Sequence, residues 1–129
     1  MKVLALPRYE RLGASSRMRF YQYLPALAAA GIAVELAPLF SDDYVRGLQQ
    51  NRRSVIDVVW AYSRRMWPFR GRRQYDLLWI EKELLPWLPA SLEHAMLAGA
   101  VPYVLDYDDA VFHCYDCHRN PLVRCWLGR

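Results

Sequence analysis

The sequence predicts an α/β domain with a Rossmann-like parallel sheet and flanking helices. Short apolar segments near residues 2–6, 33–39, 75–81 and 102–106 alternate with helix-forming stretches, a pattern typical of parallel strands joined by helical crossovers. Polar or turn-forming residues follow each apolar segment. Because parallel strands end at one edge of a sheet, we expect the loops after these segments to meet there, where open α/β sheets bind ligands.

The segment 1–39 predicts a complete strand-helix-strand unit. An apolar strand at Lys2–Leu6 is followed by the small residues Gly13 to Ser16, which include two N-cap candidates. A helix over 17–30, ended by Gly31, and a second strand over 33–39 complete the unit.

The rest of the chain predicts two more strands with helices between them. Apolar residues spaced by three and four from Ser41 to Met66 predict one amphipathic helix, which Pro68 and Gly71 should end. Further helices are expected over 90–98 and from Pro121 onward. We expect the strand order 3-2-1-4, and an incomplete sheet of about four strands whose fourth strand has an exposed side.

Composition limits the class of protein. A chain of 129 residues with 54% apolar residues can form one domain with a core. Eight arginines against three aspartates fall in residues 41–75, so the net charge of +4 is regional. The N-terminus lacks the flanks and length of a signal peptide, which predicts a cytoplasmic protein, and no segment suits a transmembrane helix.

Small residues after the first strand are candidates for contact with a ligand. Gly13, Ala14, Ser15 and Ser16 would let a phosphate or sugar approach backbone N–H groups at the start of a helix. The spacing is not that of a dinucleotide-binding fingerprint. An ordinary capped loop is the alternative.

Charged residues near the same edge form a second candidate group. Arg17 and Arg19 open the predicted helix, where a cation is unfavourable unless an anion lies nearby. Asp106, Asp108 and Asp109 follow the fourth strand, and their crowding should raise at least one carboxyl pKa. Such carboxylates suit a general base, a hydroxyl-binding group or a metal ligand. The alternatives are solvated arginines and a turn capped by aspartate.

The three cysteines carry a weaker signal. Cys114 to His118 matches the C-x-x-C-H string of haem attachment, and His113 adds a zinc-like combination. Haem attachment needs an exported chain, and adjacent residues fold poorly onto one tetrahedron. We therefore expect thiols that hold no metal or haem, with Cys114 and Cys117 matching the string by chance.

A basic and aromatic segment suggests contact with an anionic surface. It comprises Arg64, Arg65, Trp67, Phe69, Arg70, Arg72 and Arg73. Tryptophan and arginine together suit an anionic membrane surface. Nucleic acid is a less favoured partner, and a solvated basic loop is the alternative.

Three segments together resemble the N-terminal half of glycosyltransferase family 4 enzymes, which consist of two Rossmann-like domains (the GT-B fold). They are residues 13–23 (GASSRMRFYQY), residues 79–83 (WIEKE) and residues 106–112 (DYDDAVF). With the final Leu127-Gly128-Arg129, the resemblance extends over essentially the whole chain.

The resemblance implies an N-terminal, acceptor-binding part of a nucleotide-sugar-dependent transferase that moves a hexosyl group to a glycan or lipid-linked acceptor. It places Gly13 and Ala14 near the donor phosphates, and Arg17, Arg19, Glu81 and Asp106 to Asp109 on the acceptor side. The donor-binding C-terminal domain is then missing, so residues 1–129 should be inactive alone and need no cofactor besides the donor. An inner-face membrane location is compatible. The alternative is a non-enzymatic binding module that uses the basic and aromatic segment.

Overall fold

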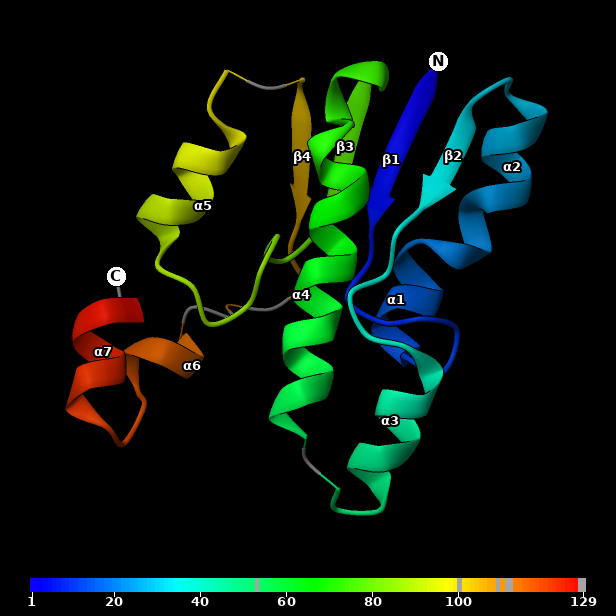
Figure 1. Cartoon of the computed structure of the whole chain (residues 1–129). Helices are drawn as coiled ribbons and strands as arrows, with labels where there is room; N and C mark the ends of the chain where they lie inside the picture. Colours follow the sequence, from blue (N-terminus) through cyan, green and yellow to red (C-terminus); the bar gives the residue numbers. More distant parts are fainter. Residues whose placement is uncertain (53, 100, 109, 111–112, 128–129) are drawn as a thin grey trace.

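The chain forms a parallel four-stranded sheet with helices on both faces (Figure 1). The computed structural model describes residues 1–52, 54–99, 101–108, 110 and 113–127. The strands are β1 (Lys2–Leu6), β2 (Ala33–Leu36), β3 (Leu77–Glu81) and β4 (Tyr103–Asp106). The predicted fold class is confirmed, and the four strands end at one edge of the sheet, which we call the rim.

The helices follow the strands in chain order. They are α1 (Ala14–Arg19), the 3₁₀ turn η1 (Tyr21–Tyr23), α2 (Leu24–Ala29), α3 (Asp42–Gln49), α4 (Val55–Arg70), the 3₁₀ turn η2 (Arg72–Gln74), α5 (Ala90–Leu97), α6 (His113–Asp116) and α7 (Pro121–Leu127). The helices expected near residues 90 and 121 are therefore present.

The predicted strand order 3-2-1-4 is wrong, because the sheet has the order β2-β1-β3-β4. The connection through α3 and α4 passes over β1, and β3 therefore lies on the side of β1 away from β2. Burial fits this order, since Leu4 and Leu6 of β1 and Leu78 and Ile80 of β3 are fully buried. The chain runs from β1 to β2 on one side and then crosses back to β3 on the other side of β1, which makes the β1/β3 boundary the switch point of the sheet.

Two apolar clusters fix the helices on the two faces. On one face, α4 and α5 pack on the sheet, with Phe69 and Leu97 against Leu4 and Ile80. On the other face, Phe20 stacks on Trp79 with ring centroids 4.2 Å apart. Every strand except the edge strands is thus covered on both sides.

The helix predicted over 17–30 is shorter and interrupted. It begins earlier, at Ala14, and α1 ends at Phe20, whose φ of −121° and ψ of −63° are not helical. Pro25 lies in the first turn of α2, which begins at Leu24. Proline has no N–H for the carbonyl of Tyr21, so a continuous helix through Pro25 would lose a hydrogen bond and suffer a clash.

The single helix predicted from Ser41 to Met66 is two helices. α3 is capped by Ser41 and α4 by Ser54, whose hydroxyl accepts a hydrogen bond from the Asp57 N–H at 3.3 Å. Asn51, between them, has a φ of 60° that breaks the helix. Pro68 does not end α4, which continues to Arg70 with Gly71 as its C-cap.

Arg65 anchors α4 to the rim. Its guanidinium is 1% exposed and donates hydrogen bonds to the carbonyl of Leu6, at 3.1 Å, and to that of Pro7. Burial lowers the pKa of Arg65 to about 9, so the side chain remains charged at neutral pH. The sequence had placed Arg65 and Phe69 in a membrane-facing patch, but both are buried and cannot face a membrane.

We predict that Arg65→Met will lower the free energy of unfolding by about 3 kcal/mol, because it leaves two buried carbonyls without donors and removes a buried cation that interacts with Glu81. Arg73→Met, at an exposed position, should change it by less than about 0.5 kcal/mol. Urea unfolding followed by circular dichroism measures both. Equal stability of the two variants would mean that water satisfies the Leu6 and Pro7 carbonyls.

Candidate functional site

The rim brings together loops that are far apart in the sequence. The loops after β1, β3 and β4 meet at the switch point, where Ser15, Glu81 and Asp108 are joined by hydrogen bonds. The loop after β2 joins them at the side, because the Leu12 N–H donates to Asp42 at 2.8 Å. The expectation that four loops share one edge is confirmed.

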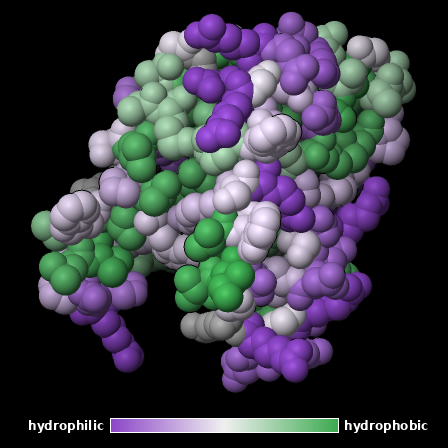
Figure 2. Space-filling view, viewed as in Figure 1, coloured by the Kyte–Doolittle hydropathy of each residue, from purple (hydrophilic) through white to green (hydrophobic). Residues whose placement is uncertain are grey.

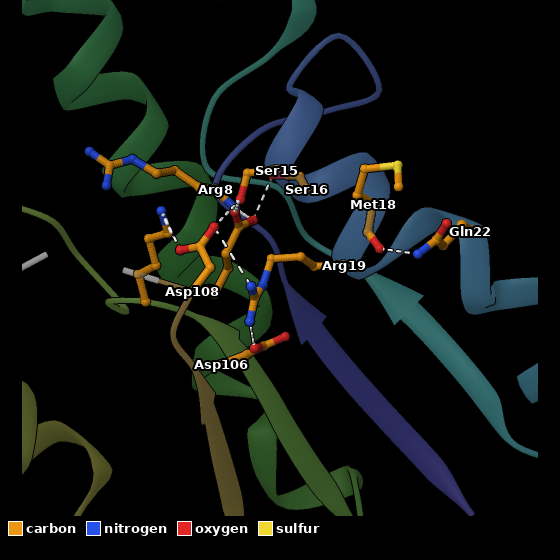
Figure 3. A network of polar contacts seen from close by, with 10 residues as sticks. Arg8, Ser15, Ser16, Met18, Arg19, Gln22, Asp106 and Asp108 are labelled. Atoms are coloured by element: carbon orange, nitrogen blue, oxygen red, sulfur yellow. Dashed lines mark hydrogen bonds and ion pairs between the residues drawn. The ribbon is translucent and has the colours of Figure 1, made fainter. Parts of the chain in front are cut away.

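Glu81 is the hub of this arrangement. Its carboxylate is 1% exposed and accepts hydrogen bonds from the Arg8 N–H at 2.7 Å, the Ser15 hydroxyl at 2.7 Å and the Ser16 hydroxyl at 2.6 Å. Figure 3 shows these donors converging from the loop after β1. Glu81 ends β3, so its position next to β1 follows from the register that pairs Leu6 with Ile80. A carboxylate so enclosed positions the loop and does not itself present a surface to a ligand.

The predicted phosphate loop is tightly packed. The Ser16 hydroxyl accepts a hydrogen bond from the Tyr9 N–H at 2.9 Å, and Ser16 is fully buried. A Cβ at Gly13 would lie 2.3 Å from the Cβ of Tyr9, so only glycine fits there. Ala14 is exposed and Ser15 is half-buried. The two serine hydroxyls are thus bound within the protein, and Ala14 is the member of the loop that faces outward.

Two cations and two carboxylates lie beside this hub. Arg19 forms an ion pair with Asp106 and a longer one with Asp108 at 3.6 Å, and the Lys82 Nζ lies 2.7 Å from Asp108. Ser15 also donates to Asp108 at 3.3 Å, which joins the two networks (Figure 3). The side chains of these four charged residues are 14–29% exposed, so a ligand can reach them. Their formal charges cancel.

The electrostatics of Asp108 differ from the expectation. Partial burial acts to raise its pKa, but the hydrogen bond and charge of Lys82 and the charge of Arg19 outweigh it and hold the pKa below the ordinary value. The crowding of acids that should raise a pKa is neutralised here by cations. Asp108 is therefore a firmly ionised hydrogen-bond acceptor at neutral pH and a weak base.

Other predicted residues have different positions. Arg17 is exposed, and its guanidinium donates to the Arg11 carbonyl at 3.2 Å, outside the network. Asp109 lies outside the described residues. Lys82 was missed as a site residue. Its φ of 62° turns the backbone just after β3, and an unusual φ is not visible in a sequence.

The basic and aromatic segment is divided by the structure. Arg64, Trp67, Arg70 and Arg73 are exposed, whereas Arg72 lies over the Phe69 ring at 4.5 Å. The same helix exposes further large apolar side chains, which we call the α4 apolar face: Val55, Ile56, Val59, Trp60 and Trp67, each 60–79% exposed. Figure 2 shows hydrophobic surface over the N-terminal half of α4. Val55, Ile56 and Val59 belong to the apolar spacing that predicted an amphipathic helix from Ser41 to Met66, and this spacing had implied that they face the core.

A hollow of about 930 Å³ lies between α4 and the segment after β2. Leu36, Pro38 and Ala61 contribute apolar surface, and Trp60 and Trp67 stand at its side. Nothing in the sequence pattern indicated it, because its walls come from separate elements.

The cysteines are free and exposed. Within the described ranges, no three His, Cys, Asp or Glu side chains are grouped so as to hold a metal ion. No helix in the described part of the chain is both long and apolar enough to cross a bilayer.

Comparisons with known proteins give no relative. No protein-family model matches the chain, and no curated protein or solved structure matches it significantly.

We predict that Glu81→Gln will reduce the free energy of unfolding by about 3 kcal/mol. The side-chain NH2 group of glutamine is a donor, and in this buried position it would face the backbone and hydroxyl donors that bind the carboxylate of Glu81. The Arg8 amide should also exchange its hydrogen faster with solvent. Glu35→Gln, at a side chain that is 51% exposed, is the matched control and should change little. Slow exchange at Arg8 in the Glu81 variant would contradict the role of Glu81 as the hub.

Proposed function

We propose that this chain is the acceptor-binding part of a nucleotide-sugar-dependent glycosyltransferase that transfers a hexosyl group to a glycan or lipid-linked acceptor. The observation that carries the proposal is the partly exposed network of Arg19, Lys82, Asp106 and Asp108 at the switch point. Open α/β sheets bind ligands in this crevice. Mixed donors and acceptors of this kind suit the hydroxyl groups of a sugar.

Asp108 is the residue we assign to the acceptor hydroxyl. Transfer forms a bond between the acceptor oxygen and the anomeric carbon and breaks the bond from that carbon to the nucleoside diphosphate, which leaves and takes up the hydroxyl proton. Because the pKa of Asp108 is lowered, its carboxylate acts mainly by accepting a hydrogen bond and orienting the hydroxyl. Asp106, held by Arg19, sets the position of that guanidinium for a second sugar oxygen.

Most contacts to the nucleotide-sugar donor would come from outside residues 1–129. Ala14 is exposed at the start of α1, next to the buried Gly13, and could approach a donor phosphate across a cleft. Neutralising the leaving diphosphate needs further donors, which we assign to a second, donor-binding domain.

We predict that residues 1–129 alone turn over no nucleotide sugar and that the same chain joined to a donor-binding domain does. Positioning the acceptor does not replace stabilisation of the leaving group. Release of nucleoside diphosphate, measured side by side for both proteins, is the assay. Equal specific activity from a monodisperse chain of 129 residues would refute the division of labour.

In the active protein, Asp108→Asn should lower turnover by about 100-fold, because the acceptor hydroxyl loses the carboxylate that orients it. The loss of stability should be small because the side chain is 29% exposed. Asp76→Asn, which keeps an oxygen for the Lys2 N–H at the opposite edge of the sheet, is the control. Equal turnover by both variants would remove Asp108 from the proposed site.

A second candidate function is favoured by the α4 apolar face. Five large apolar side chains project from one helix beside the exposed Arg64 and Arg70. A tryptophan ring inserts into a membrane at the level of the lipid headgroups, and the positive charge of arginine attracts anionic lipids. The chain would then act as a non-enzymatic module, or as an enzyme part, that binds the surface of an anionic membrane.

We predict that the chain sediments with phosphatidylglycerol vesicles and that added salt weakens this, because attraction of about 1 kcal/mol per basic residue is screened. Trp60→Glu with Trp67→Glu should abolish sedimentation, and so should Arg64→Glu with Arg70→Glu and Arg73→Glu. Leu92→Glu, at an exposed position on α5, is the control. No sedimentation by the unchanged chain, or unchanged sedimentation of the tryptophan variant, would exclude this function.

A further inference from the structure

The hollow between α4 and the segment after β2 is separate from the charged network of the rim. Its described lining residues fall between residues 10 and 68, and none of Arg19, Lys82, Asp106 and Asp108 is among them. It lies toward β2, away from β4, α6 and α7 (Figure 1). A volume of about 930 Å³ is large enough for a small molecule. The hollow is therefore a candidate ligand site of its own.

One side of α4 forms a wall of the hollow. Asp57, Trp60, Ala61 and Arg64 are spaced by three and four residues, so they lie on one side of the helix. Trp60 is 69% exposed, which leaves its ring open to a ligand. Arg64 lies two turns beyond Asp57, about 10 Å along the helix axis, and its guanidinium donates to the Leu39 carbonyl at 3.3 Å. The first turns of α4 thus offer a carboxylate and an indole ring at a distance from the guanidinium.

The hollow is acidic although the chain is basic. Among the described lining residues, four carboxylates stand against the guanidinium of Arg64, a formal charge of −3, whereas the whole chain carries +4. The carboxylates belong to Glu10, Glu35, Asp43 and Asp57. Charge complementarity therefore favours a positively charged ligand.

Two of these carboxylates have no cation beside them. Glu35 and Asp43 are paired with cations outside the lining, Lys2 at 3.7 Å and Arg46 at 2.7 Å respectively. Glu10 accepts a hydrogen bond from the Asp42 N–H at 2.8 Å. Neither Glu10 nor Asp57 forms an ion pair with any residue that the structure describes. A bound cation would meet both charges without displacing a cation already present.

We propose that the hollow binds a small organic cation, an alkylammonium ion. A cation is attracted to the face of an indole ring, and Trp60 and Asp57, one turn apart, hold the charged group together. The alkyl part covers the apolar surface of Pro38 and Ala61. The carboxylates repel an anion, and a neutral molecule of similar shape gains only the apolar contacts. The inference goes beyond both proposed functions, because it needs neither a sugar donor nor a membrane.

Three probes with the same hydrocarbon chain and different charges test the proposal. They are hexyltrimethylammonium, hexanol and hexyl sulfate, each titrated into the ¹⁵N-labelled chain while the indole N–H chemical shifts are recorded. The Trp60 signal should move with hexyltrimethylammonium, and hexanol should bind about tenfold more weakly. Hexyl sulfate should bind most weakly. Trp126 on α7, which is 71% exposed and outside the hollow, is the internal control and should not move.

Variants identify the groups that bind the charge, with the Trp67 indole, which also lines the hollow, as the signal. Asp57→Asn should weaken binding of hexyltrimethylammonium about threefold, and Trp60→Leu, which keeps an apolar side chain, about fivefold. Asp76→Asn and Trp126→Leu are the matched controls and should bind as the unchanged chain does. Circular dichroism checks that each variant is folded.

The outcomes separate the kind of ligand from the site. Equal affinity for hexanol, or tighter binding of hexyl sulfate, would overturn the choice of a cation. A Trp60 signal that does not move, or a Trp126 signal that moves as much, would overturn the site. Unchanged affinity in the folded Asp57 and Trp60 variants would overturn the assignment of these residues to the charged group.

Discussion

The buried carboxylate of Glu81 is the interaction on which the rim depends. It closes the end of β3 and binds the backbone of Arg8 and the hydroxyls of Ser15 and Ser16. A buried carboxylate is tolerated only when its lone pairs are satisfied, so the loop after β1 is constrained to the path that supplies these donors. This path of the chain brings the Ser15 hydroxyl within hydrogen-bond distance of Asp108 and places Arg19 where it forms an ion pair with Asp106.

The charged network is consequently preorganised. Arg19 and Lys82 approach the acids from different loops, and neither carboxylate is left to repel the other. Such a set discriminates by geometry, because a ligand must replace water around groups whose positions are already fixed. A protonatable base would need the opposite arrangement, with the cations removed or the acids brought together.

Local patterns foretold the strands and the shared rim, and with them the meeting of Ser15, Glu81, Arg19 and Asp108. They could not foretell the strand order, because the side on which α4 crosses β1 depends on packing between distant segments. The buried face of α4 could not be predicted either. It contains Ala61, Arg65 and Phe69, and an arginine is expected on an exposed face. The apolar spacing of Val55, Ile56 and Val59 instead predicted that these three residues face the core, whereas they are exposed.

The position of Arg65 links two surfaces that are otherwise separate. Its guanidinium binds the carbonyls of Leu6 and Pro7, at the end of β1 and the start of the loop that Glu81 binds, while Trp60 and Trp67 project from the other side of the same helix. One helix thus contacts both the start of the loop that carries Ser15, through Arg65, and the outer surface, through Trp60 and Trp67.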